Sequence, residues 1–328
     1  MKYRIKLNLS DGKSIYAADP SSIIGAAKVI QNTGIAQTFK MKARLGTPST
    51  PSQFWQTVDV GNFTTPGIAR DLSLQDATCD DIAIASKSNI ASTIWNIGDE
   101  KTITLSTDEE ITVRIIGFNR DDLADGSGKA GITFEMKDCL KTTYEMAPAD
   151  TNAYSWRDST LRKNTVPLIL GQFPEALQNV IQTVKKNTVA GNRNTSVITT
   201  EDTLFLLSPS EIYSRTGLEN DVMAQIHNYV DEILADGGTQ YDYYKNKIGD
   251  IPVSYVQSDG YEELYTYLVK NRLQYVIFQG EVMRPTEWWL RSPSATSRTG
   301  YYRISEDGES WTTYEGNYKF GVSFCFCV

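Results

Sequence analysis

The sequence predicts an α+β protein. Short segments that alternate apolar and polar residues, which are typical of strands, are interspersed with segments of helical periodicity. The 328 residues are 40% hydrophobic and 22% charged, a composition typical of a globular protein long enough for two or three cores. The chain ends in a nearly continuous apolar run, GVSFCFCV at 321–328, whose short length and β-branched and aromatic content predict a central strand buried on both faces.

The first 75 residues predict a small α+β domain. Residues 1–18 alternate as a hairpin around an Asp-Gly turn, and a helix is expected to follow and to stop at Gly34. Strands at 38–45 and 54–60 flank a loop rich in proline, serine and threonine. We interpret residues 1–75 as a domain for attachment or assembly.

The rest of the chain divides into a linker and a larger domain. Residues 76–94 are expected to form a helical linker, and residues 95–328 a ligand-binding domain with an insertion around 218–280. The expected helices are two between 156 and 186, the second opened by Pro174 and extending to Val184, and two in the insertion, at 221–235 and 261–271. The expected strands lie at 102–106, 112–118, 131–136, 196–199 and 203–207.

Charge and hydropathy exclude several classes of partner. A net charge of -8 and an isoelectric point near 4.9 argue against nucleic acid and anionic membranes. No window reaches the roughly 20 apolar residues that a membrane span needs, and the N-terminus lacks the apolar core of a secretory signal. The four cysteines are scattered without a C-x-x-C pair, so we expect free thiols rather than disulfides or a zinc site.

No catalytic or cofactor motif emerges, so we expect a protein that binds without catalysing a reaction and that needs no cofactor. His227 is the only histidine, which excludes a multi-histidine metal centre. Asp121, Asp122 and Asp125 cluster beside glycines, but Leu123 and Ile132 occupy positions where a helix-loop-helix calcium site needs oxygen ligands. A turn in which the aspartates bond the backbone is favoured over an irregular metal site, which this pattern leaves open.

The last forty or so residues combine an apolar frame with a polar, aromatic-rich filling. Trp288, Trp289 and Leu290 form one end of the frame and the C-terminal strand the other. Between them, stiff aromatic residues are interspersed with small polar ones, a mixture typical of binding surfaces. The predicted ligand-binding residues are Ser294, Thr296, Ser297, Arg298, Tyr301, Tyr302, Trp311, Thr313, Tyr314, Asn317 and Tyr318. The tyrosine-rich segment 241–244 is a second candidate contact surface.

Five blocks carry a resemblance to a known family. WNIGD at 95–99, ITVRIIGFNRDDLADGSGKAGITFEMKDCL at 111–140, LFLLSPSEIY at 204–213, WWLRSP at 288–293 and the terminal FGVSFCFCV resemble an uncharacterised domain family of phage and prophage tail proteins and bacterial surface proteins. The resemblance implies a C-type-lectin-like fold in the C-terminal part. That fold is similar to formylglycine-generating enzymes and to variable receptor-binding proteins that retroelements diversify.

The sequence departs from these patterns in three places. Ser323 and Phe324 replace the Arg and Pro with which the family usually ends. The sugar-and-calcium motifs of C-type lectins are absent, so calcium-dependent sugar binding is not implied. Cys325 and Cys327 do not match the setting of the catalytic cysteines of formylglycine generation, so that activity is not carried over.

Together, the residues and the resemblance favour a tail-tip or tail-fibre adhesin. Its partners would be a host cell-surface protein or glycan and other tail proteins, and a homo-oligomer, a trimer, is expected by analogy alone. It would be made in the bacterial cytoplasm and located in the virion tail, or otherwise at the bacterial cell surface. The alternatives are an adhesin of the bacterium itself and an enzyme of the formylglycine-generating or glycan-hydrolase type. Titratable residues converging in a deep cleft would favour the enzyme, and an exposed aromatic surface the adhesin.

Overall fold

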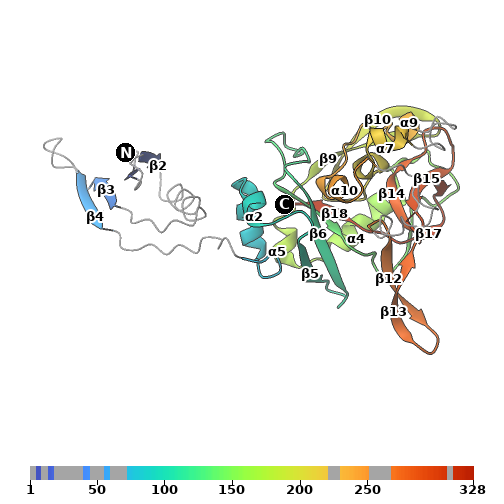
Figure 1. Ribbon diagram of the computed structural model, residues 1–328, viewed down its shortest axis with the longest axis horizontal. Helices are drawn as coiled ribbons and strands as arrows, with labels where there is room; N and C mark the ends of the chain where they lie inside the picture. Colours follow the sequence, from blue (N-terminus) through green and yellow to red (C-terminus); the bar gives the residue numbers. More distant parts are fainter. Residues whose placement is uncertain are drawn as a thin grey trace. The chain divides into compact units, whose positions relative to one another are not determined.

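The computed structural model of the protein (Figure 1) has two compact units, Met1–Ser73 and Leu74–Val328. It describes residues 72–220, 230–250, 267–308 and 313–328, together with four strands nearer the N-terminus. These strands, β1 (Ile5–Asn8), β2 (Ser14–Ala17), β3 (Lys40–Arg44) and β4 (Trp55–Asp59), form an antiparallel sheet in the order β2-β1-β3-β4. The helix expected between β2 and β3 lies outside the described residues. Both helices and antiparallel sheets occur, so the protein is α+β, as predicted.

A five-stranded antiparallel sheet organises the second unit. Its order is β11-β18-β7-β6-β5, and the C-terminal strand β18 lies inside it, which confirms the predicted central strand. Phe326 of β18 lies opposite Phe134, and the two rings stack with centroids 5.2 Å apart. The strand is buried on both faces. Its side chains alternate, so Phe326 lies in an apolar layer with Phe134, and Cys327 lies on the opposite face, where its thiol donates to Asp121. The bounds are β5 Glu100–Thr104, β6 Glu110–Phe118, β7 Ile132–Met136, β11 Leu204–Phe205 and β18 Cys325–Cys327.

The helix expected in the linker packs into this unit. α2 (Cys79–Lys87) begins at a capping box in which Thr78 and Asp81 exchange side-chain to backbone hydrogen bonds. The Ser86 hydroxyl donates to the carbonyl of Val328 and accepts from the N–H of Gly131, 3.0 Å away. A Cβ at Gly131 would lie within 2.7 Å of Ser86, so glycine permits this close approach. A short helix, α3 (Ala91–Ile94), follows.

Two of the expected helices end in the wrong place. Residues 161–170 form a π-turn, η2 (Leu161–Thr165), that continues into α4 (Val166–Leu170), and the next helix, α5 (Glu175–Gln178), has a single turn. Val184 therefore belongs to strand β9 (Val184–Gly191), which pairs with β10 (Asn194–Asp202), and not to a helix. Pairing with a strand later in the chain overrides local helical periodicity here. Lys270 likewise begins a strand, so the helix expected at 261–271 does not reach its predicted end.

Short helices fill the region between β11 and β12. They are α6 (Pro209–Ile212), α7 (Arg215–Glu219), α9 (Val230–Ile233) and α10 (Asp242–Lys247). α9 is the described part of the helix expected at 221–235, while His227 lies outside the described residues. The described helices include none that is both long and apolar enough to cross a membrane.

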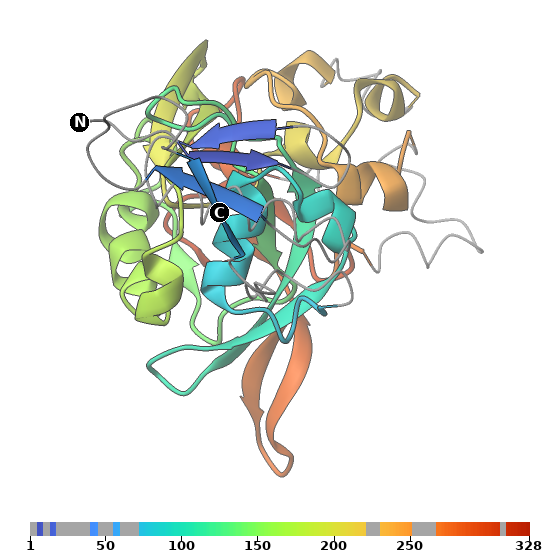
Figure 2. The same cartoon turned by 90° about the vertical axis from the view of Figure 1, so that its left-hand side faces the viewer.

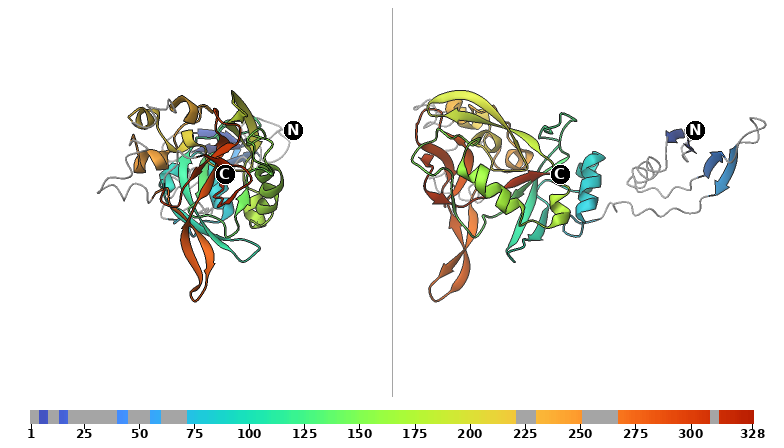
Figure 3. Two further views of the ribbon diagram at one scale, coloured as in Figure 1. Left: turned by 90° about the vertical axis from the view of Figure 1, so that its right-hand side faces the viewer. Right: turned by 180° about the vertical axis from the view of Figure 1, so that it is seen from behind.

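The C-terminal part adds a hairpin and two smaller sheets. β12 (Lys270–Val276) and β13 (Gly280–Thr286) form a hairpin that projects from the unit in every view (Figure 1, Figure 2, Figure 3). β14 (Trp288–Pro293), β15 (Gly300–Ile304) and β16 (Thr313–Glu315) make a sheet with β15 in the middle. β17 (Lys319–Phe320) pairs with β8 (Tyr144–Glu145). Trp288, Trp289 and Leu290 are 0% exposed, which confirms the apolar frame.

Candidate functional site

The loop between β14 and β15 is held from beneath by one buried side chain. The Asn152 amide donates to the carbonyls of Ser294, Ser297 and Gly300 at 3.0 to 3.3 Å. The Asn152 backbone N–H donates to the carbonyl of Arg298, 2.9 Å away. Asn152 itself is 0% exposed. Four loop positions are thus fixed by a single residue, so the loop is preorganised.

The small polar residues of this loop bond mainly to one another and to α9. The Ser294 hydroxyl donates to Glu232 and accepts from the N–H of Ser297, and the Thr296 hydroxyl donates to the other Glu232 oxygen at 2.8 Å. Ser294 is only 2% exposed. It was predicted to touch a ligand, but it instead shapes the loop that presents Thr296 and Arg298, both of which are exposed.

Tyr301 and Tyr302 lie in the core, in contrast to their predicted role as surface anchors. They are 0% and 3% exposed because β15 is the middle strand of its sheet and is covered on both faces. The Tyr301 hydroxyl donates to the carbonyl of Ser155, 3.2 Å away, and burial raises the Tyr301 pKa above its usual range. The ring meets Trp289 edge to face with centroids 6.3 Å apart. Both tyrosines therefore support the site from within.

Four aromatic rings connect this core to the surface. Trp289 packs on Phe320 with centroids 4.6 Å apart, Phe320 meets Tyr314 at 5.4 Å, and Tyr314 meets Tyr318 edge to face at 4.7 Å. The Arg303 guanidinium lies over Tyr314, 5.1 Å from its centroid. The series begins at a fully buried ring and ends at Tyr318, which is 50% exposed. Tyr318 is thus a stiff apolar contact whose position is fixed from below.

Three predicted residues remain, and two of them are described. Thr313 is half-buried opposite Tyr302, Asn317 is exposed, and Trp311 lies outside the described residues. The carbonyl of Gly316 accepts from the N–H groups of Met146 and Ala147 at 2.8 and 2.9 Å. The 316–318 turn and the 294–299 loop are therefore both fixed to one segment, 146–155.

We call the exposed part of this region the C-terminal loop surface. Sequence reasoning missed Tyr154 on the supporting segment; it is 37% exposed, and no periodic pattern marked it. The surface comprises Thr296, Arg298, Asn317 and Tyr318, with the half-buried Ser297, Thr313 and Tyr314 at its edges.

A second constellation, buried beneath a pocket of about 480 Å³, contains opposite charges in close contact. Lys186 pairs with Asp121 at 2.7 Å and with Glu211 at 2.5 Å, and Arg291 pairs with Glu211 at 3.0 Å. The Tyr241 hydroxyl donates to Asp121, 2.8 Å away. We call these five residues the Asp121 network. It contains Tyr241 of the tyrosine-rich segment, which is 2% exposed and so is a core residue rather than a contact residue.

The electrostatics of the Asp121 network indicate a structural role. The Lys186 ammonium lowers the pKa of Asp121 to about 2, and Arg291 and Lys186 lower that of Glu211. The two carboxylates in turn raise the pKa of Lys186, although its burial opposes this. Each group thus keeps its ordinary charge through neutral pH. A general acid or base needs a pKa shifted toward neutrality instead.

The other two aspartates of the predicted turn bond to residues close to them in the sequence. Asp122 pairs with Lys129 at 2.7 Å, and Asp125 accepts the N–H of Ser127 at 2.8 Å. No group of three or more His, Cys, Asp or Glu is placed to hold a metal within the described parts of the chain. All four cysteines are free thiols, as predicted.

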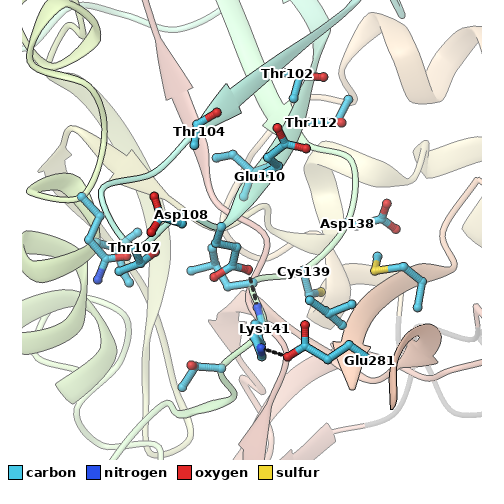
Figure 4. Close-up of a pocket in the computed structure, with 18 of the residues that line it drawn as sticks. Thr102, Thr104, Thr107, Asp108, Glu110, Thr112, Asp138, Cys139, Lys141 and Glu281 are labelled. Carbon is cyan, nitrogen blue, oxygen red and sulfur yellow. Dashed lines mark hydrogen bonds and ion pairs between the residues drawn. The ribbon is translucent and has the colours of Figure 1, made fainter. Parts of the chain in front are cut away.

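A groove of about 800 Å³ lies between the β5–β6 hairpin and the β12–β13 hairpin, which contributes Leu273, Glu281 and Met283 (Figure 4). Its floor is apolar, formed in part by Ile111, Leu140 and Ile169. Lys141 is its one cation, and it pairs with Glu281 across the groove. We call it the acidic groove because five carboxylates line it, those of Asp108, Glu109, Glu110, Asp138 and Glu281.

Comparison with known proteins gives one family. Residues 130–328 match a family model described as a domain of unknown function, DUF6273. The match includes β7, β14 to β18 and the whole C-terminal loop surface, and it leaves out β5 and β6. No curated protein and no solved structure matches the chain.

Proposed function

The chain belongs to the DUF6273 family, whose function is unknown, and from its own surface we propose that it is a phage or prophage tail receptor-binding protein. In this proposal the C-terminal loop surface recognises a protein or glycan on the host cell. The observation that carries the proposal is the series of rings from Trp289 to Tyr318, which holds an exposed tyrosine rigidly. Tyr318 follows β16 at the end of the β15–β16 pairing where Gly300 lies opposite Glu315, and the loop with Arg298 and Thr296 enters β15 at the same end. Tyrosine and arginine are the residue types that dominate binding energies at protein interfaces.

Preorganisation supports a binding role. A loop already fixed by Asn152 and Glu232 loses little conformational entropy when a ligand docks on it. Tyr318 contributes area with only two side-chain torsions to restrict, and the hydroxyl of Thr296 and the amide of Asn317 supply adaptable hydrogen bonds. The mechanism is binding alone, without a covalent step.

We propose further that the second unit has a C-type-lectin-like fold. Two features support this: the last strand lies inside the central antiparallel sheet, and the contact loops lie outside that sheet on β14 to β17. Substitution at exposed positions such as Arg298 and Tyr318 would then leave the core unchanged, as retroelement diversification requires. Substitution at Tyr301 would not, because its ring is fully buried.

The test is a binding screen with the full chain. Fluorescently labelled protein is incubated with intact cells of a panel of bacterial strains and measured by flow cytometry. We expect selective binding to some strains, and pretreatment of those cells with protease or periodate then assigns the ligand to protein or glycan. Absence of binding to every strain that the source phage or prophage can infect would refute the proposal.

A further inference from the structure

The β12–β13 hairpin exposes an apolar tip. Tyr275 is 77% exposed, Ile277 71% and Phe278 102%. Met283, in the middle of the hairpin, is 50% exposed. The segment 274–280, QYVIFQG, carries no charge. Soluble monomers seldom expose several large apolar side chains on one projecting element, and such patches mark contact sites.

The conformation of the tip adds to this argument. Phe278 has a φ of +72°, a left-handed conformation that asparagine or glycine adopts much more readily than phenylalanine. Because its side chain contributes nothing to the core, the fold gains nothing from an aromatic residue there. A contact outside the unit accounts for phenylalanine at this position.

The two faces of the hairpin differ in charge. Arg272 lies directly opposite Arg284 in the register, so both guanidinium groups leave the same face. Leu273 and Met283, also opposite each other, occupy the other face and line the acidic groove. The Arg272 guanidinium donates to the carbonyl of Lys141, 2.9 Å away, whereas Arg284 is exposed. The hairpin thus combines an apolar tip with an exposed cation, Arg284.

The acidic groove has the complementary character. Its floor is apolar, and Figure 4 shows the carboxylates of Asp108, Glu110 and Asp138 around it. Neither Asp108 nor Glu110 has an ion-pair partner among the described residues. The chain's own hairpin cannot enter the groove, because its residues Leu273, Glu281 and Met283 form one wall and the hairpin projects away from the unit (Figure 1, Figure 2).

We propose that the occupant of the acidic groove is the β12–β13 hairpin of a second copy of this chain. Ile277 and Phe278 would cover the apolar floor, and Arg284 would meet Asp108 and Glu110. This self-association is independent of the C-terminal loop surface, so failure of one proposal leaves the other unaffected.

The test is the molar mass of the full chain, measured by light scattering and sedimentation across a concentration series. We expect wild type to associate, and Phe278→Asn to weaken association about tenfold or more. Arg284→Glu and Glu110→Arg should each weaken it as well, and the double variant should recover it because the new charges attract. Tyr318→Ala is the control and should associate like wild type.

Three results would overturn the proposal. One is a wild type that stays monomeric throughout the series. This result overturns the proposal also where the hairpin of the monomer binds lipid vesicles or another protein. The second is an oligomer that Phe278→Asn leaves intact. The third is a charge-exchanged double variant that remains as weak as its parents, since the Arg284 partner would then lie outside the groove.

Discussion

Asp121→Asn tests whether the Asp121 network stabilises the fold. The Lys186 ammonium holds the pKa of Asp121 at about 2, against about 3.9 for a free aspartate, and this difference corresponds to roughly 2–3 kcal/mol of stability at neutral pH. The substitution also leaves Lys186 with one carboxylate instead of two. Breaking a buried ion pair costs about 3–5 kcal/mol, and the surviving Glu211 contact should reduce this to about 2–4 kcal/mol.

The assay is thermal unfolding of the full chain at neutral pH. For a unit of this size each kcal/mol lowers the Tm by about 2–4 °C, so a loss of about 2–4 kcal/mol corresponds to a fall in Tm of about 4–16 °C. Asp122→Asn is the matched control: Asp122 is the neighbouring residue, but its side chain is 66% exposed in a surface pair, which is worth about 0–1 kcal/mol.

The sign of the pH dependence follows from the lowered pKa. The stabilisation by Asp121 is complete above about pH 4 and is lost as the pH falls through about 2, because the folded carboxylate is then protonated as well. The difference in Tm between wild type and Asp121→Asn should therefore become smaller below about pH 4. The conclusion that the Asp121 network stabilises the fold is refuted by either of two results. One is a Tm of Asp121→Asn within about 1 °C of wild type at neutral pH, and the other is a difference in Tm that does not change with pH.

The remaining predictions concern the hairpin, the loop support and the thiols. At a protein concentration where wild type is monomeric, Phe278→Asn should leave the Tm unchanged or raise it, because asparagine tolerates the left-handed conformation of a fully exposed residue. A clear drop in the Tm of the monomer would show that Phe278 packs within it. Gly191→Ala should lower the free energy of unfolding in denaturant by more than about 2 kcal/mol, because φ is +74° and a Cβ would overlap the Asn152 carbonyl oxygen. A smaller loss would mean that the backbone around Gly191 moves to accommodate the methyl group. In native protein, iodoacetamide should modify Cys79 before Cys139, because burial raises the Cys139 pKa to about 12; equal rates by mass spectrometry would contradict this.

Periodicity in the sequence predicted the frame of the fold well. The C-terminal strand is a nearly continuous apolar run and Trp288–Leu290 are three consecutive large apolar residues, which the fold removes from water. Val184 was wrongly assigned to a helix because its pairing with β10 depends on residues later in the chain. Local spacing does not encode that contact.

The candidate site was predictable only in part. Composition marked 294–318 as a contact region, but composition does not show which side chains are buried. The buried Tyr301 and the exposed Tyr318 therefore looked alike. The Asp121 network joins residues up to 170 positions apart, from Asp121 to Arg291, and no spacing signalled it. One signal was present: Lys186 lies in phase with the buried Val184 and Thr188 on β9, where strand alternation places it inward.

The most direct test of the central claim is the affinity of a loop-surface variant for a strain that wild type binds. In the variant, Arg298→Ala and Tyr318→Ala remove two exposed side chains, so the Tm should stay close to that of wild type. Leu168→Ala, which removes a side chain 69% exposed elsewhere on the unit, is the control. We expect the variant to lose about thirtyfold or more in affinity and the control to match wild type. A folded variant that binds as tightly as wild type would show that recognition lies outside the C-terminal loop surface.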